Sequence, residues 1–237
     1  MKKYFTALCV FIFTTSFNPV FAGGAGVYGI ISFVSGDVTI TSGQKSFPAK
    51  IGAKIQVADS IVTGNGIARI QIAGTYICHI EKNTKITFQE ILETNEKDSY
   101  NINLSTGQIL SRLIREKNKK ANLTIITPTI TAAVRGTDFM VSETEKSAPA
   151  EGEKSITTGV YVSQGIVEVE SPGREKVNVN AGEEVKVLPG ELRKSMMEDF
   201  ISAKMKILDE LKIMKEFNCK LIEEQKEKNR KLLEEMK

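Results

Sequence analysis

Between residues 28 and 188, apolar and polar residues alternate in short runs, and turn sequences separate the runs at intervals of roughly 8–12 residues. Gly64-Asn65-Gly66 is a strong turn signal, which we expect to need backbone of positive φ. This rhythm predicts a mainly β domain: a compact β-sandwich or roll, or a short β-solenoid, built from many short strands. Because no repeat of fixed length is visible, a regular solenoid is the less favoured of these architectures.

The expected strands share period-two alternation and a high content of Val, Ile, Thr and aromatic residues. They cover residues 30–34, 38–41, 61–63, 67–72, 75–80, 85–88, 100–104, 108–113, 157–163, 166–169, 177–179 and 184–187. Ser105-Thr106-Gly107 is expected to be a turn, so that the strands on either side of it are separate.

The segment Thr127–Val141, TPTITAAVRGTDFMV, predicts two extended stretches joined by a tight turn. Gly136 suits a turn of positive φ, and a bidentate ion pair between Arg135 and Asp138 would stabilise it. We expect a structural role for the motif, with a ligand-binding arginine as the alternative. The motif residues are Arg135, Gly136, Thr137, Asp138 and Phe139.

After residue 188 the pattern changes from strands to a helix. Pro189-Gly190 is expected to end the β domain, and Ser195 with Glu198 fits a helix capping box. No Pro or Gly occurs from Met196 to Lys237, so this stretch predicts one long amphipathic helix of about 63 Å, and residues 189–237 are assigned to the C-terminal helix segment. We expect its first turns to pack on the β domain, and a coiled coil along its whole length, with self-association, is the alternative.

The N-terminal residues have the pattern of an export signal. Residues 1–22 combine Lys2 and Lys3 with a short apolar run and end at Val20-Phe21-Ala22, as signal peptides do. An uncleaved anchor is the alternative, although the apolar run is shorter than the roughly 20 residues that span a bilayer. Residues 23–27 then form a flexible mature N-terminus, and we expect an exported protein without a membrane span after processing.

Charge limits the choice of partners. The formal net charge is +3, of which Lys2 and Lys3 supply two, so the rest of the chain has no strong field for nucleic acid. The segment Arg112–Lys120 is strongly basic. We expect it to be a solvated hairpin tip, with contact to an acidic partner as the alternative. Its basic residues are Arg112, Arg115, Lys117, Lys119 and Lys120.

Candidate chemistry is sparse. His79 is the single histidine, which disfavours metal sites and Ser–His–Asp triads, and neither a phosphate loop nor a dinucleotide motif is present. We therefore expect no enzymatic activity and no cofactor. Cys78 is expected to be a core residue, while Cys219 lies on the predicted helix, and whether the two are free or bridged stays open.

Several motifs, taken in order, resemble one family. The segment TPTITAAVRGTDFMV resembles the signature of the FecR domain, the periplasmic sensor domain of iron-citrate regulators. Residues 28–188 resemble that domain over its length. The matching pieces before the signature include Gly36-Asp37-Val38, Phe47-Pro48-Ala49, Ala58-Asp59-Ser60-Ile61 and Thr63-Gly64, with Phe47 standing where the family often carries Trp.

The resemblance implies a non-catalytic binding or scaffolding module, located in the periplasm or cell envelope. A periplasmic signal-relay component that reads an outer-membrane or wall partner is the alternative. We expect the partner to be a protein or an envelope glycan. Because the pattern shows no anti-sigma segment or spanning helix before the first strand, regulation of a sigma factor is not the expected role.

Overall fold

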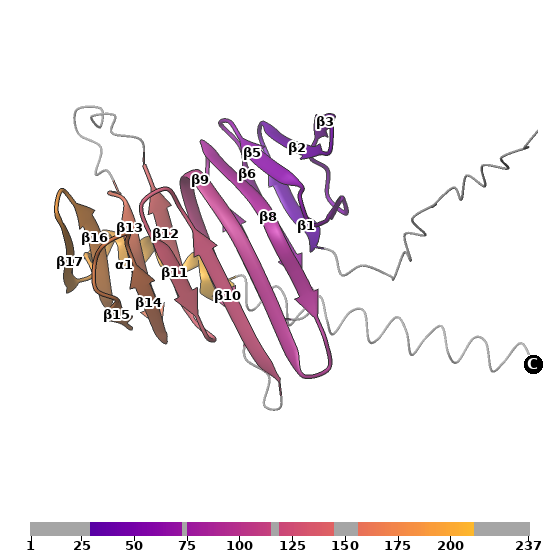
Figure 1. The fold of residues 1–237 in the computed structure, drawn as a ribbon. Helices are drawn as coiled ribbons and strands as arrows, with labels where there is room; N and C mark the ends of the chain where they lie inside the picture. The colour runs from indigo at the N-terminus through magenta and orange to yellow at the C-terminus, as the bar shows by residue number, and fades with distance from the viewer. Residues whose placement is uncertain (1–28, 73–74, 115–118, 145–155, 211–237) are drawn as a thin grey trace, which may run out of the picture.

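In a computed structural model of the chain, the described residues are 29–72, 75–114, 119–144 and 156–210. They form 17 strands and one short helix, which confirms the mainly β prediction (Figure 1). The predicted signal peptide, the mature N-terminus and the distal part of the predicted C-terminal helix lie outside the described residues.

The strands form two layers joined by one long strand, β9 (Lys97–Leu113). Sheet B contains, in spatial order around β9, β3 (Lys45–Pro48), β2 (Val38–Ser42), β5 (Ser60–Thr63), β8 (Thr84–Glu93), β10 (Lys120–Ile126), β11 (Thr131–Val134), β14 (Ile166–Glu170) and β15 (Val177–Asn180). Sheet A contains β4 (Lys54–Ile55), β1 (Gly29–Ser35), β6 (Ile67–Ile72), β7 (Tyr76–Ile80), β12 (Asp138–Glu143), β13 (Gly159–Gln164), β16 (Glu183–Leu188) and β17 (Glu191–Met196).

The path of the chain explains why a sandwich and a short solenoid look alike in the sequence. The chain passes from one sheet to the other at many of its connections, for example between β1 and β2, between β7 and β8, between β11 and β12, between β13 and β14, and between β15 and β16. All but one of the neighbouring strand pairs are antiparallel, and the parallel pair is β9 with β10. The result is a two-layered sandwich with a regular alternation of layers.

Strand β9 corrects one sequence prediction. Residues 100–104 and 108–113 belong to one bent strand, not to two strands separated by a turn. The first half of β9 pairs with β8 and β10 in sheet B, and the second half pairs with β7 and β12 in sheet A. The bend lies at Gly107, whose φ is +95°, and a Cβ there would lie 2.3 Å from Thr84 Oγ1. A glycine is needed here for a change of sheet rather than for a reversal of the chain.

The prediction that the turn Gly64-Asn65-Gly66 needs backbone of positive φ is also wrong. Neither Gly64 nor Gly66 has positive φ. The nearby glycine that does is Gly36, whose φ is +72°. A Cβ at Gly66 would lie 2.6 Å from Asp37 N, Asp37 O and Ser35 O. Gly66 is therefore required because two backbones approach closely, not because of its own dihedral angle.

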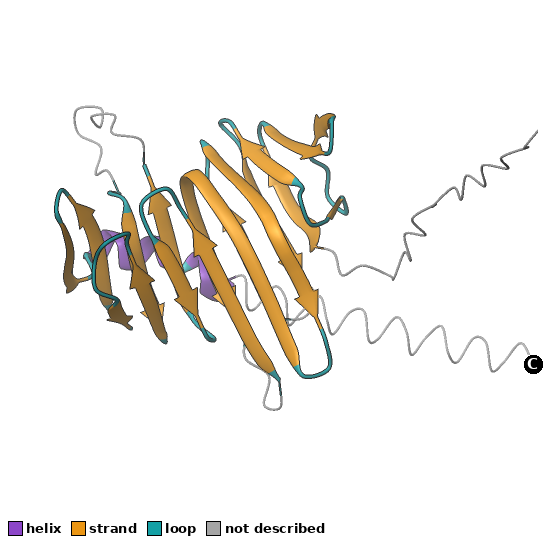
Figure 2. Ribbon diagram, viewed as in Figure 1, coloured by secondary structure: helices purple, strands orange, loops and turns teal. Residues whose placement is uncertain are grey.

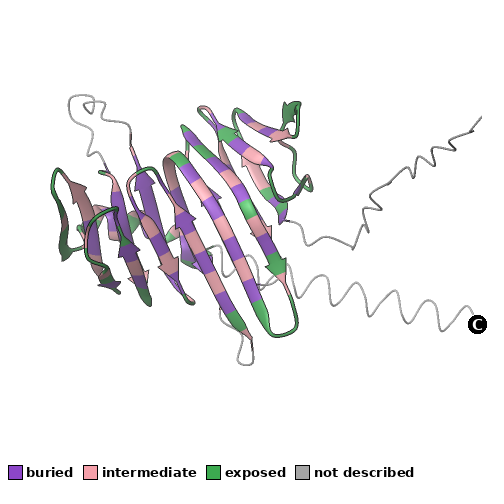
Figure 3. Cartoon of the chain, viewed as in Figure 1, coloured by how far each residue is buried: buried purple, intermediate pink, exposed green. Residues whose placement is uncertain are grey.

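The main core lies between the sheets, where alternating residues of both layers meet. Strands β7 and β12 depart from this alternation, because their residues are buried on both faces; β12 is buried along its length in Figure 3. A second apolar cluster covers their outer side. It contains Ile77, Leu110, Met140, Ile156, Tyr161, Ile201, Met205 and Leu208.

The second cluster exists because helix α1 (Asp199–Met205) packs on the outer face of sheet A (Figure 2). The expected packing of the first helical turns on the β domain is confirmed, but the expected start is wrong. The N-cap is Glu198, and Ser195 lies in β17, where its hydroxyl donates to Glu184 Oε1 at 3.1 Å. Pro189-Gly190 joins β16 to β17, so the β domain extends to Met196. The open edge of β16 pairs with residues 191–196, which outweighs the local capping signal.

Candidate functional site

The family-motif turn connects the two sheets. It follows β11 in sheet B and leads into β12 in sheet A, and Gly136 has a φ of +75°, as predicted. Arg135 is exposed on the sheet B side, whereas Asp138 is 5% exposed on the sheet A side. The predicted ion pair between Arg135 and Asp138 is therefore wrong, because the turn directs the two side chains to opposite layers.

The partner of Asp138 is Arg112, from the neighbouring strand β9 (register pair Asp138↔Arg112). Arg112 Nε donates to Asp138 Oδ1 at 2.7 Å, and Arg112 Nη2 donates to Asp138 Oδ2. Arg112 also reaches the helical segment, donating from Nη1 to the Leu208 carbonyl and from Nη2 to Asp209 Oδ1 at 2.9 Å. The bidentate pair with Asp138 fixes the Arg112 side chain on sheet A, and the bonds to Leu208 and Asp209 fasten the chain after α1 to it.

The prediction of a solvated basic tip is wrong for two of its residues. Arg112 is 5% exposed and belongs to the contact with α1. Lys119 Nζ lies 2.6 Å from Oδ1 of Asp98, a fully buried carboxylate at the start of β9. Lys120 is exposed at the start of β10. Arg115 and Lys117 lie outside the described residues, so partner contact by them stays a prediction.

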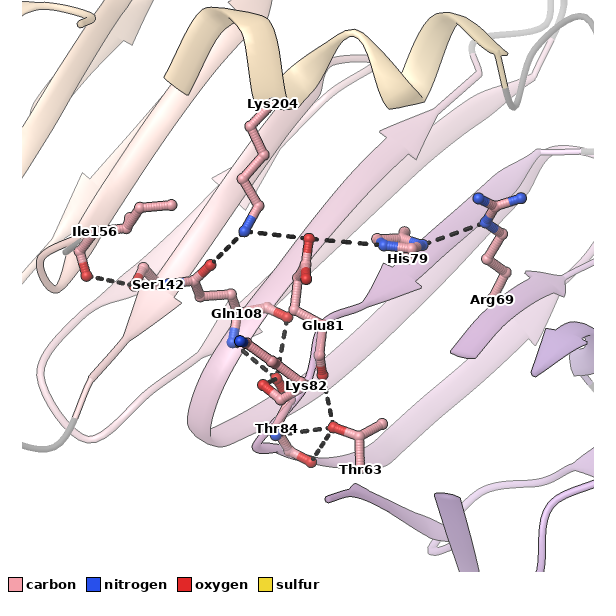
Figure 4. A network of polar contacts seen from close by, with 10 residues as sticks. All are labelled: Thr63, Arg69, His79, Glu81, Lys82, Thr84, Gln108, Ser142, Ile156 and Lys204. Carbon is pink, nitrogen blue, oxygen red and sulfur yellow. Dashed lines mark hydrogen bonds and ion pairs between the residues drawn. The ribbon is translucent and has the colours of Figure 1, made fainter. Parts of the chain in front are cut away.

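A second polar network joins α1 to the outer face of sheet A (Figure 4). Arg69 Nε donates to His79 Nδ1 at 3.3 Å, so the ring proton of the neutral histidine is on Nε2, 3.7 Å from Glu81 Oε1. Lys204 of α1 lies 3.1 Å from Glu81 Oε1 and donates to Gln108 Oε1 at 2.9 Å. His79 and then Lys204 hold the pKa of Glu81 at about 2. The network therefore favours an ionised Glu81 facing the helix.

The outer face of sheet B differs, because no described element covers it. It carries an open groove of about 730 Å³ over β10, β11, β14 and β15. Its floor is Ala133, and the register places Thr124 on one side of Ala133 and Glu168 on the other. The lining residues are Asn122, Leu123, Thr124, Ala133, Val134, Arg135, Gly136, Gly165, Ile166, Glu168 and Asn178.

One end of the groove is the family-motif turn. Gly136 and Gly165 both have positive φ, and a Cβ at Gly165 would lie 3.0 Å from the Gly136 carbonyl. Arg135 stands beside these turns and has no hydrogen bond or ion pair with any described residue. The Glu168 carboxylate, by contrast, is paired with Lys176 Nζ at 2.7 Å. The groove thus presents one cation without a counter-charge.

Several buried hydroxyl groups are hydrogen-bonded within the sandwich. Tyr76 and Ser111 hydroxyls are 3.0 Å apart, and Tyr100 Oη donates to Glu93 Oε1 at 2.8 Å. Cys78 is buried and free, and burial raises the pKa of its thiol to about 12. Its predicted core position is confirmed, whereas Cys219 lies outside the described residues.

Among the described residues, no group of three or more His, Cys, Asp or Glu side chains is arranged to hold a metal ion. No described helix is long and apolar enough to cross a bilayer.

Comparisons with known proteins bear on residues 59–168, which match the family model described as FecR protein. The matched range includes the family-motif turn, Arg112 and the floor of the groove. The match confirms the resemblance that the sequence motifs indicated.

Two crystal structures of a proposed anti-sigma factor from Parabacteroides distasonis ATCC 8503, at 2.50 and 1.65 Å resolution, are also similar in part. Each is 16% identical, with a TM-score of 0.45, and the overlap covers 58% of this chain and 58% of that chain. The comparison with curated proteins found no match.

Proposed function

We propose, from the FecR domain that residues 59–168 of this chain form, that the protein is an exported, non-catalytic binding module that relays partner binding to its C-terminal segment. The observation that carries the proposal is the position of Arg112. This single side chain bonds both Asp138 of the family motif and the backbone that follows α1. A change at the motif and a change in the docking of α1 are therefore linked through one residue.

The contact between α1 and sheet A has the properties of one that can form and break reversibly. Its apolar part consists of Ile201, Met205 and Leu208 packed over sheet A, and its polar part is ionic, through Asp209 and Lys204. The Asp209 side chain is 70% exposed, so water can compete for this end of the contact. A short helix held in this way can be released without unfolding the sandwich, since the main core lies on the other side of sheet A.

The absence of catalysis is part of the proposal. His79 is 2% exposed and lies between Arg69 and Glu81 beneath the helix, an arrangement that explains its position structurally. Its Nδ1 accepts from Arg69 and so is not available as a base. A histidine that contacts Glu81 beneath α1 supports a relay better than a reaction.

The relay is tested by crosslinking in the intact envelope, followed by recovery of this chain with its partner. Amide hydrogen exchange over residues 199–210 is then compared with and without the recovered partner. Relay predicts one reproducibly recovered receptor protein, and a changed exchange rate in this segment when the receptor is bound. Asp209→Ala should alter that exchange in the free protein, while Asp199→Ala, at the exposed start of α1, should not.

A scaffold is the second candidate, and the same experiment separates the two. Recovery of envelope glycan, or of this chain alone, would favour a scaffold, as would a bound partner that leaves exchange over residues 199–210 unchanged. Export is checked independently by N-terminal sequencing of the envelope protein. The expected mature N-terminus is Gly23, and a protein that begins at Met1 would contradict processing.

A further inference from the structure

We propose that the groove on sheet B binds an extended peptide segment of a partner protein, one that presents a carboxylate next to an aliphatic side chain. The proposal deepens the binding role above and rests on it, since it names the contact surface and the chemistry of the partner. The groove and the helix α1 lie on opposite outer faces, so the two roles occupy different residues.

The shape of the groove follows from side-chain size along β11. Thr124, Ala133, Glu168 and Asn178 are successive register neighbours across four strands. Ala133 has the smallest side chain of the four, so the surface over it lies closer to the sheet than the surface over the residues on either side. β10, β11 and β14 are paired on both sides at these positions, and only β15 has a neighbour on one side alone, so a ligand lying over the groove floor would contact side chains and would not add a strand there.

The charge of the groove identifies the first feature of the ligand. Arg135 is exposed at one end and has no partner among the described residues, and its guanidinium can donate two parallel hydrogen bonds to a carboxylate. The neighbouring carboxylate of Glu168 is neutralised by Lys176, which also lies 3.6 Å from Glu170. Repulsion of an incoming anion by Glu168 is thereby reduced.

The apolar part identifies the second feature. Ile166 lines the groove next to Arg135 and is 56% exposed, so an aliphatic surface is available beside the guanidinium. An aliphatic side chain of the ligand would pack against the branched side chain of Ile166. None of the groove-lining residues is aromatic, so the groove lacks the flat rings on which a sugar face could stack. The amides of Asn122 and Asn178 can bond to the peptide backbone. These observations favour a peptide over an acidic glycan.

The proposal is tested by NMR titration of the purified full chain with blocked tetrapeptides. The probe is acetyl-Gly-Leu-Glu-Gly-amide, with Gly-Leu-Gln-Gly and Gly-Gly-Glu-Gly counterparts that remove the charge and the aliphatic group. We expect amide shifts confined to β10, β11, β14 and β15, and a dissociation constant at least about tenfold weaker for the glutamine peptide. The leucine-to-glycine change should weaken binding by a smaller factor.

Variants of the chain give the matched controls. Arg135→Ala should weaken binding of the glutamate peptide about tenfold and abolish its preference over the glutamine peptide, while Arg135→Lys should retain part of that preference. Ala133→Leu should block the groove without removing charge. Arg193→Ala, at an exposed arginine on β17 paired with Glu191, should change nothing. Unchanged thermal unfolding of Arg135→Ala verifies that the loss is one of binding.

Each contrary result has a definite meaning. Equal binding of the glutamate and glutamine peptides, or shifts outside the groove, would overturn the site. Arg135-dependent binding of an oligogalacturonate with no binding of the peptides would replace the peptide by an acidic glycan. If the peptide binds but a partner leaves exchange over residues 199–210 unchanged, the relay fails and the groove stands. If a partner alters that exchange while every groove ligand fails, the relay stands and the groove fails.

Discussion

The two outer faces of the sandwich are built from the same kinds of strand, yet their charged side chains lie in different environments. On sheet A, α1 covers the strands, and Arg112, Asp138 and Glu81 are paired beneath or beside it. On sheet B, no described element covers the strands, and Arg135 has no partner among the described residues. The comparison shows that a charged side chain on a strand becomes structural when a neighbouring element covers its face.

The family-motif turn contributes to both faces at once. Asp138 enters the covered face and Arg135 remains on the open face, although only two residues separate them in the sequence. Asp138 therefore contributes to stability, and Arg135 is available for binding. The predictions below test this division, starting with the largest expected effect.

The largest effect is expected from Arg112→Ala. The substitution leaves the carboxylate of Asp138 buried and unpaired, and it releases the backbone after α1, so the free energy of unfolding should fall by about 3–5 kcal/mol. Urea denaturation measures this loss. Arg135→Ala is the matched control on the open face and should change stability by less than about 0.5 kcal/mol. Equal losses in the two variants would remove the distinction between the faces.

The next largest effect is expected from Met205→Ala on α1. Met205 is 2% exposed over sheet A, and its truncation should cost about 2–4 kcal/mol of docking free energy. Exchange of amides in residues 199–210 should accelerate more than exchange in the core strands. Lys206→Ala alters the adjacent exposed residue and should leave both measurements nearly unchanged. Acceleration throughout the sandwich instead would mean that α1 belongs to one cooperative unit with it.

A smaller effect is expected from acid. The pKa of Glu81 is held at about 2, below its ordinary value of 4.5, by His79 and Lys204. A carboxylate whose folded pKa is depressed stabilises the fold above its unfolded pKa. That stabilisation, on the order of 2 kcal/mol, is lost as pH falls from 4.5 to 2.

The check is to measure unfolding free energy against pH for the wild type and for Glu81→Gln. The difference between the two should shrink below pH 4.5, because protonation makes the wild-type side chain resemble the variant. A constant difference across this range would show that Glu81 does not stabilise the fold through its charge.

The smallest effect is expected on the open face. Thr124→Ala removes a partly exposed hydroxyl that lines the groove, and stability should change by less than about 0.5 kcal/mol. Thermal unfolding is sufficient for this measurement. A loss above 1 kcal/mol would indicate that the outer face of sheet B is covered by part of the chain in solution.

Many elements of the fold were predictable because they depend on local alternation. Residues 67–72 were expected as a strand and form β6 with the same bounds, and Gly136 adopts the predicted positive φ. The errors have a common physical cause. Residues 105–107 look like a turn and Ser195 looks like a helix cap, but sheet pairing determines both positions. Local propensities are weaker than a row of backbone hydrogen bonds to a neighbouring strand.

The candidate site was predicted only in part. The motif Arg135–Phe139 was identified, but Arg112 was assigned to an exposed tip because it lies next to a run of lysines. The signal that could have separated it is period-two alternation, since Arg112 continues the strand that includes Leu110. The partner of Asp138, however, comes from a strand 26 residues earlier in the chain, and no local pattern identifies it.

The sequence by itself determined the β class, the resemblance to the FecR domain and the tight turn at Gly136, because these depend on short-range alternation, ordered motifs and backbone geometry. Only the tertiary structure decided which arginine pairs with Asp138, that β9 crosses between the sheets, and that α1 covers one face and leaves the other open. The physical reason is that ion pairing and burial depend on which distant segments meet in space. A charge three positions away in the sequence can face the opposite layer, whereas one on a neighbouring strand can lie within hydrogen-bonding distance.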